Sequence, residues 1–193
     1  MGRKARLDKN AVVQAAVDLV NAEGSEALSL SRLAEQLGIQ TPSLYNHVNG
    51  LPGLQRELVL INARTLGDWV SKAAIGKAGP TAILSIAQAY RAYIKAFPGL
   101  YLMSLRAART HTAPDPELTQ AEDRVVEVTV AVIASLGLQG DDAIHAVRAL
   151  RSVVHGFATL ELAGGFGLPL DCDESFNRLI DVLTRGLTSS SAN

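Results

Sequence analysis

The chain has 193 residues, of which 48% are hydrophobic and 19% are charged, so it can bury a core and is not globally disordered. Its 18 basic and 19 acidic residues give a formal net charge of −1, which excludes a uniformly polybasic protein but allows a local basic face. The single cysteine, Cys172, excludes an intramolecular disulfide and a cysteine-cluster metal site.

The N-terminal part predicts short helices. A first helix is expected between Asp8, which is suited to cap it, and Gly24, which stops it. A second covers 31–37 and closes at Gly38. A third is predicted at 42–48, with the Thr41 hydroxyl as its N-cap and Pro42 in the first turn.

The rest of the chain predicts longer amphipathic helices separated by glycine- and proline-containing breaks. Strand alternation is hard to find, so we expect an all-α protein of about nine helices. The longer helices are expected at 51–74, 81–96, 98–109, 116–136, 141–163 and 173–187.

The segment 31–48 has the spacing of a helix-turn-helix. The small Ala34 lets the two helices approach closely, and Gly38 permits the turn between them. Because Leu44 and Val48 share the inward face of the second helix, its polar residues should face outward. On spacing alone, an ordinary three-helix packing unit is as compatible with this segment as DNA binding.

The outward residues suit a DNA duplex. Asn46 is able to read adenine, and Thr41 or Ser43 to touch a base edge or a phosphate. Tyr45 and His47 are suited to donate to phosphate oxygens. The predicted site is therefore the N-terminal end of this helix in a major groove.

A basic arm precedes the first helix. Arg3, Lys4, Arg6 and Lys9 stand against Asp8, a net charge of +3 in ten residues. Such an arm is suited to follow the DNA backbone or a minor groove, although a solvated charged terminus is the alternative. No apolar signal core follows it and no stretch is long enough to span a bilayer, so we expect a cytoplasmic protein without a membrane partner.

The stretch Leu37-Gly38-Ile39-Gln40-Thr41-Pro42-Ser43-Leu44-Tyr45-Asn46-His47-Val48 resembles the DNA-binding domain of the tetracycline-repressor-like (TetR) regulators. The resemblance covers about 8–60 and implies a homodimer on a palindromic, double-stranded DNA operator. It implies DNA-binding roles for eight residues, which join the arm residues Arg3, Lys4 and Arg6 as candidate contacts: Ser29, Ser31, Thr41, Pro42, Ser43, Tyr45, Asn46 and His47. Family members often carry a phosphate-gripping lysine after the recognition helix, where this chain has Leu51, so one ionic contact is missing.

By the same resemblance, 1–50 is the DNA-binding domain, with its arm at 1–9, and 51–193 is the effector-binding and dimerisation domain. The segment 149–166 resembles a WHG-type C-terminal class of the family. His155-Gly156 of that motif is present, but its tryptophan is absent.

Two helices of the larger part are candidates for the dimer interface, at 141–163 and 173–187. Paired across a two-fold axis, they would make a four-helix contact, although the same apolar positions also suit a plain core. The candidates are Val147, Leu150, Val154, Phe157, Phe176, Leu179, Ile180 and Leu183.

Aromatic residues in the middle helices suggest a pocket for a small-molecule effector, since such pockets are mostly apolar. Aromatic residues at helical spacing are, however, more often plain core. The candidates are Trp69, Tyr90, Tyr93, Tyr101 and Met103.

Enzyme motifs are missing from the sequence. No HExxH, G-x-S-x-G or Walker loop occurs, so we expect no catalytic residue, no metal and no cofactor. The preferred hypothesis is a repressor that a small effector releases from its operator. The alternatives are a helical small-molecule-binding protein or enzyme without DNA binding, and a protein-interaction module that uses the 141–163 helix.

Overall fold

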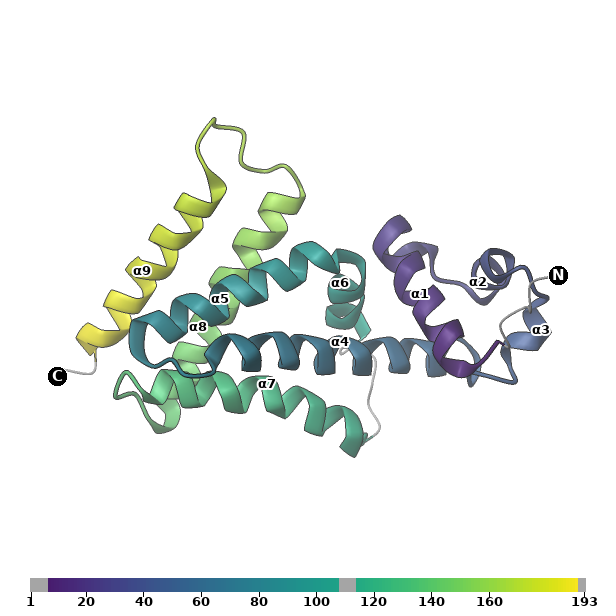
Figure 1. Ribbon diagram of the computed structural model, residues 1–193, viewed down its shortest axis with the longest axis horizontal. Helices are drawn as coiled ribbons and strands as arrows, with labels where there is room; N and C mark the ends of the chain where they lie inside the picture. The colour runs from purple at the N-terminus through teal and green to yellow at the C-terminus, as the bar shows by residue number, and fades with distance from the viewer. Residues whose placement is uncertain (1–6, 108–113, 191–193) are drawn as a thin grey trace. The chain divides into compact units, whose positions relative to one another are not determined.

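All regular structure in a computed structural model, which describes residues 7–107 and 114–190, is helical, as predicted (Figure 1). None of the described helices is long and apolar enough to cross a membrane. The elements are α1 (Lys9–Glu23), η1 (Ser25–Ala27), α2 (Leu30–Leu37), α3 (Thr41–Leu44), α4 (Gly50–Ala74), α5 (Gly79–Ala96), α6 (Pro98–Ala107), α7 (Pro116–Ala134), α8 (Gly140–Leu162) and α9 (Cys172–Ser190).

Local backbone chemistry sets the ends of the first helices where the sequence predicts them. The Asp8 side chain accepts a hydrogen bond from the Ala11 N–H at 2.8 Å and caps α1. Gly38 adopts a left-handed conformation with φ of 64°, and the Ile39 N–H then bonds back to the Ala34 carbonyl at 3.0 Å. This bond closes α2 as a Schellman turn and aims the chain into α3.

The third helix differs from its prediction. Thr41 is not the N-cap: Gln40 takes that position with an extended backbone, and no side chain caps the helix. The α-helix ends at Leu44, and bonds over three residues continue it as tight turns, for example His47 N–H to the Leu44 carbonyl at 2.9 Å. The predicted helix 42–48 is thus one α-turn followed by 3₁₀-like turns, because the chain must turn before α4 begins.

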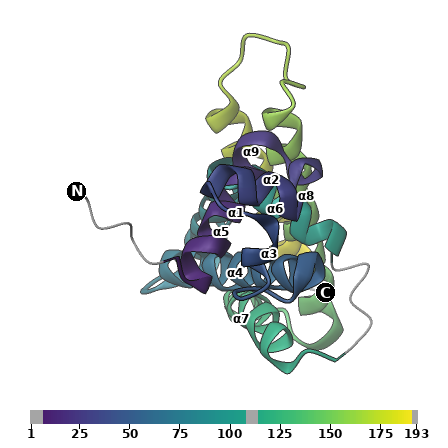
Figure 2. The same cartoon turned by 90° about the vertical axis from the view of Figure 1, so that its right-hand side faces the viewer.

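The chain packs as two compact units. The first holds the described residues up to Asn62 together with 97–118, so α6 belongs with α1, α2 and α3 (Figure 2). The second holds Ala63–Ala96 and the described residues from Thr119 on. The predicted boundary at 50/51 concerns function and stays a prediction, whereas the packing divides α4 near its middle.

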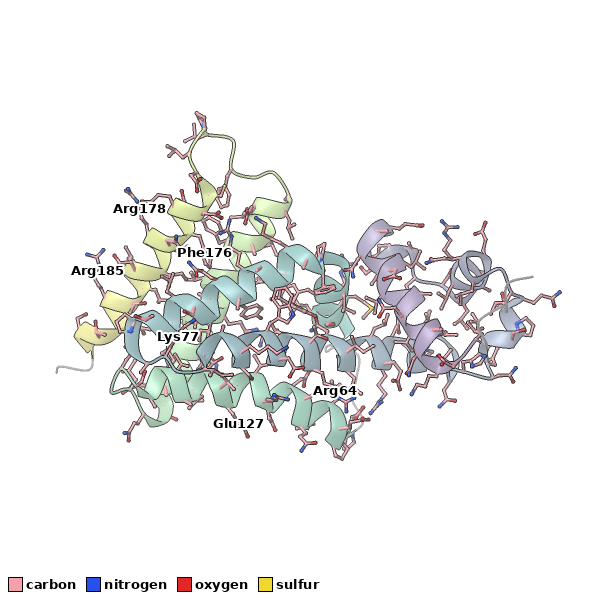
Figure 3. The ribbon with its side chains drawn as sticks, viewed as in Figure 1. Arg64, Lys77, Glu127, Phe176, Arg178 and Arg185 are labelled. Carbon is pink, nitrogen blue, oxygen red and sulfur yellow. The ribbon has the colours of Figure 1, made fainter. Side chains whose placement is uncertain are left out.

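The second unit is built around α5, which packs against α8 and α9. Helix α7 lies along the later part of α4, where Gly67 leaves room for the partner helix: a β-carbon there would stand 3.5 Å from Val125 Cγ2. From α9, Phe176 points into the interior while Arg178 and Arg185 project outward (Figure 3).

Candidate nucleic-acid interface

The recognition segment, defined as residues 41–48, exposes part of the polar surface that the sequence predicts. Leu44 and Val48 are buried and anchor the segment to the first unit. Tyr45 is 61% exposed although it is a large aromatic residue, and Asn46 beside it is exposed too. His47 is half-buried. The buried Leu44 therefore anchors the segment and leaves the polar groups of Tyr45 and Asn46 facing solvent.

The other predicted contact residues divide by exposure. In the recognition segment Pro42 is exposed, whereas Thr41 and Ser43 are half-buried. The Ser29 hydroxyl caps α2 by accepting from the Arg32 N–H at 3.2 Å, and Ser31 is exposed. The predicted arm residues Arg3, Lys4 and Arg6 lie outside the described residues.

Gln40 is a candidate contact that the sequence analysis missed. It is exposed, stands immediately before the recognition segment, and makes no capping bond with its side chain. An amide of this kind is able to pair with the edge of an adenine. The signal was a polar residue between the helix-ending Gly38 and Pro42, at a position that a capping hydroxyl was expected to serve.

Ion pairs engage each lysine and arginine that the structure describes in the first unit. Lys9 is the first residue of α1, rather than part of a free arm, and it contacts Glu57. Arg32 forms a bidentate pair with Glu23, and this contact lowers the pKa of that carboxyl. The pairs are Lys9–Glu57 at 2.8 Å, Arg32–Glu23 at 2.6 Å, Arg32–Glu35 at 2.8 Å, Arg56–Asp115 at 2.6 Å, Arg56–Glu117 at 2.7 Å and Arg106–Glu26. These cations are thus already paired, and the donors that the recognition segment exposes are the hydroxyl of Tyr45 and the amide of Asn46.

The structure distributes the predicted pocket residues over both units. Trp69 and Tyr93 meet edge to face in the second unit, with ring centroids 5.8 Å apart, and burial raises the pKa of the Tyr93 hydroxyl. Tyr90 is half-buried on the same helix as Tyr93. Tyr101 and Met103 are buried on α6 in the first unit. The effector pocket stays a prediction.

The predicted interface residues on α8 and α9 also divide. Val147, Leu179 and Leu183 are half-buried and keep surface that a second copy could cover. The remaining five are buried within the single chain, as the plain-core alternative expects: Leu150, Val154, Phe157, Phe176 and Ile180. Large apolar side chains that are exposed on these helices are Ile144, Leu160, Leu162 and Val182.

A buried arginine ties the helices of the second unit together. The Arg91 guanidinium pairs with both carboxylate oxygens of Glu161 at 2.8 Å and with Asp173 at 2.7 Å. It also lies over the rings of Phe157 and Phe176, at 5.2 and 4.9 Å from their centroids. Residues of α5, α8 and α9 meet at this one side chain, which fixes the two helices of the predicted interface relative to α5.

Comparisons with known proteins agree with this architecture. Residues 83–183 match the family model described as the tetracyclin repressor-like C-terminal domain. An HTH-type transcriptional regulator of Mycobacterium tuberculosis, Rv0681, is 33% identical over 97% of this chain and 84% of its own length. The regulator YobS of Bacillus subtilis is 30% identical over 100% of this chain and 99% of its own.

Solved structures share the fold. The TetR family regulator PfmR from Thermus thermophilus superposes with a TM-score of 0.69 over 90% of this chain and 97% of its own, at 21% identity. The helix order seen here is thus that of a known helical fold.

Proposed function

Since the chain belongs to the TetR family of transcriptional regulators, which generally bind DNA and respond to ligands, we propose that it is a repressor that a small effector releases from a palindromic operator. It acts as a homodimer in the cytoplasm. Its relatives are regulators of a non-enzymatic family.

The exposed recognition segment is the single observation that carries this proposal. Tyr45 is 61% exposed directly after the buried Leu44, so a large aromatic hydroxyl faces solvent from a firmly anchored turn. Such a group is suited to a phosphate oxygen, with Asn46 beside it for a base edge.

Dimerisation supplies the second requirement for an operator. Two recognition segments must stand about 34–36 Å apart to enter successive major grooves. The half-buried Val147, Leu179 and Leu183, together with the exposed Ile144 and Val182, are the surface that we assign to the two-fold contact. The buried members of the predicted set act indirectly, by holding α8 and α9 in place.

The response to an effector follows from linkage. A ligand that prefers a different spacing of the two recognition segments lowers DNA affinity, and DNA lowers the affinity for the ligand by the same factor. We assign the effector to the second unit, with Trp69, Tyr90 and Tyr93 as candidate contacts.

Selection of DNA by the full chain tests the proposal. The wild-type protein is used to enrich duplexes from a random library, and the affinity of the Tyr45→Ala, His47→Ala double variant for the enriched duplex is measured. We expect a loss of about 100-fold or more, because a hydrogen bond to a charged phosphate contributes about 1.5–3 kcal/mol and each dimer loses two sets of them. A Thr119→Ala, Gln120→Ala variant, altered at two exposed residues of α7, serves as the matched control.

The outcome separates the proposal from its alternatives. Unchanged affinity of the double variant, with both variants folded and equal in size, would show that 41–48 only packs. A chain that enriches no duplex would favour the helical binding protein without DNA contact.

A further inference from the structure

A network of charges connects the starts of α1 and α7 through α4 in the first unit. Arg56 and Glu57 are consecutive residues of α4, and their partners come from both sides of the sequence. Glu57 accepts from Lys9, the first residue of α1, at 2.8 Å, and from Arg56 at 3.3 Å. Arg56 in turn pairs with Asp115 and Glu117, so five side chains form one continuous path.

The Arg56 guanidinium binds the Asp115 carboxylate in a bidentate, fork-shaped contact. Its Nε donates to Asp115 Oδ2 at 2.6 Å and its Nη2 to Asp115 Oδ1 at 2.9 Å. The same Nη2 donates to Glu117 Oε2 at 2.7 Å. Two parallel bonds to one carboxylate hold both position and orientation, unlike the single contact of an ordinary surface pair. The side chains of Arg56 and Asp115 are only 28% and 20% exposed.

Asp115 also defines where α7 begins. Its Oδ1 accepts from the Leu118 N–H at 3.2 Å, which caps the helix that starts at Pro116. One carboxylate therefore binds the first turn of α7 and the guanidinium on α4 together. A shift of the start of α7 has to move Arg56 or break this fork.

Arg56 lies close to the recognition segment along the chain. Helix α4 begins at Gly50, two residues after the segment ends, and Arg56 follows less than two turns later. Because a helix is stiff over so short a distance, the position of Arg56 sets the position of the first turn of α4. Val48 and the exposed residues before it directly precede that turn, so its position constrains theirs.

We propose that Arg56, Asp115 and Glu117 are positioning residues for DNA binding: they latch the start of α7 to α4 and thereby hold the recognition segment in its binding orientation. This inference rests on the function proposed above. None of the three residues needs to touch DNA. A change that shifts the start of α7 would then alter the orientation of the recognition segment.

Two variants of the full-length protein break the latch from opposite sides. Asp115→Ser keeps a residue that is able to cap α7 but cannot pair with Arg56. Arg56→Gln keeps the length of the side chain and removes its charge. We expect each to lower the affinity for the duplex enriched by the wild type roughly tenfold, and the double variant to lose no more than either alone. Hydrogen exchange in 41–48 should accelerate in each.

Matched controls separate positioning from general stability. Arg124→Gln breaks the pair with Asp68, which also joins α7 to α4 but lies exposed in the second unit, and it should leave DNA affinity unchanged. Arg56→Lys retains the charge and should restore part of the affinity. Thermal unfolding of all variants identifies any loss of fold.

The inference is overturned if Asp115→Ser and Arg56→Gln bind the duplex as Arg124→Gln does. Losses that simply add in the double variant and follow the drop in melting temperature also overturn it, because they describe a structural role. If the wild type enriches no duplex at all, the proposed function itself fails and this inference falls with it.

Discussion

The backbone of Gly99, in the first turn of α6, lies directly against the carbonyl oxygen of Val20 near the end of α1. A β-carbon on Gly99 would overlap that oxygen and has no side chain to push aside, since the neighbouring atoms belong to the backbone of α1. Next to this contact, the Leu100 N–H donates to Asn21 Oδ1 at 3.0 Å. The first turn of α6 therefore packs directly against the end of α1.

Gly99→Ala should destabilise the chain. The added methyl group forces α6 away from Val20, and overpacking of this kind costs about 1–3 kcal/mol. Urea unfolding of the full chain measures the change. Leu102→Ala, on an exposed position of the same helix, should change the free energy of unfolding by less than about 0.5 kcal/mol. Equal stability of the two variants would mean that α6 does not rest on α1.

Asn21→Ala removes the acceptor that caps α6 from outside the helix. The Leu100 N–H is one of the donors that no residue of α6 can satisfy, so we expect a loss of about 1 kcal/mol in urea unfolding. Asn21→Asp keeps an oxygen acceptor and adds a negative charge at a helix N-terminus, where the charge is favourable. This variant should unfold no more easily than the wild type. A loss in Asn21→Asp as large as that in Asn21→Ala would contradict the capping role.

The local rules that predict helix ends worked where one residue decides the geometry. Asp8 caps α1 and Gly38 ends α2 because each acts on neighbouring backbone atoms, which a sequence displays directly. The packing of α6 on α1 leaves no such local signal in the sequence. Gly99 and Val20 are far apart in the chain, and a glycine after Pro98 has many explanations until the facing carbonyl is known.

The recognition segment was predictable for a related reason. The spacing of Leu44 and Val48 assigns one face to the interior, so the exposure of Tyr45 follows. Charge pairing was not predictable: Lys9 was assigned to a free arm, and only the fold brings it to Glu57. The apolar positions of α8 and α9 could not be divided into core and dimer surface from the sequence, because residues of a core and residues of an interface recur at the same helical spacing.

Acid should weaken the latch at Asp115. The hydrogen bonds from Arg56 and from the Leu118 N–H lower the pKa of Asp115 to about 2. A carboxyl whose pKa is lower in the folded chain stabilises the fold above its ordinary pKa of about 3.9, and this contribution is lost as the pH falls toward about 2. The difference in the free energy of unfolding between the wild type and Asp115→Asn should therefore shrink over this range and stay constant above about pH 5. A difference that does not vary with pH would exclude the ion pair as its cause.

Arg91→Ala should be among the most destabilising single changes in the second unit. It leaves Glu161, which is only 15% exposed, with Lys95 as its remaining cation, and it removes the cation that lies over the rings of Phe157 and Phe176. Removing one partner of a buried ion pair costs about 3–5 kcal/mol. Arg178→Ala breaks the exposed pair with Glu174 and should cost less than about 1 kcal/mol. Comparable losses in chemical unfolding would show that the Arg91 cluster contributes no more than a surface pair.

Salt dependence should identify which cations meet the DNA backbone. Each lysine and arginine that the structure describes in the first unit has a carboxylate partner, so the counterions released on binding should come mainly from the contacts of Arg3, Lys4 and Arg6. With about 0.9 counterions per phosphate contact and two arms in a dimer, removal of residues 1–6 should lower the slope of log affinity against log salt by roughly five. Lys9→Gln, which releases Glu57 but removes no arm charge, should leave the slope nearly unchanged. If the truncated protein keeps its slope, then Arg32 or Arg106 exchanges its carboxylate for a phosphate when the protein binds DNA, and the arm is a solvated terminus.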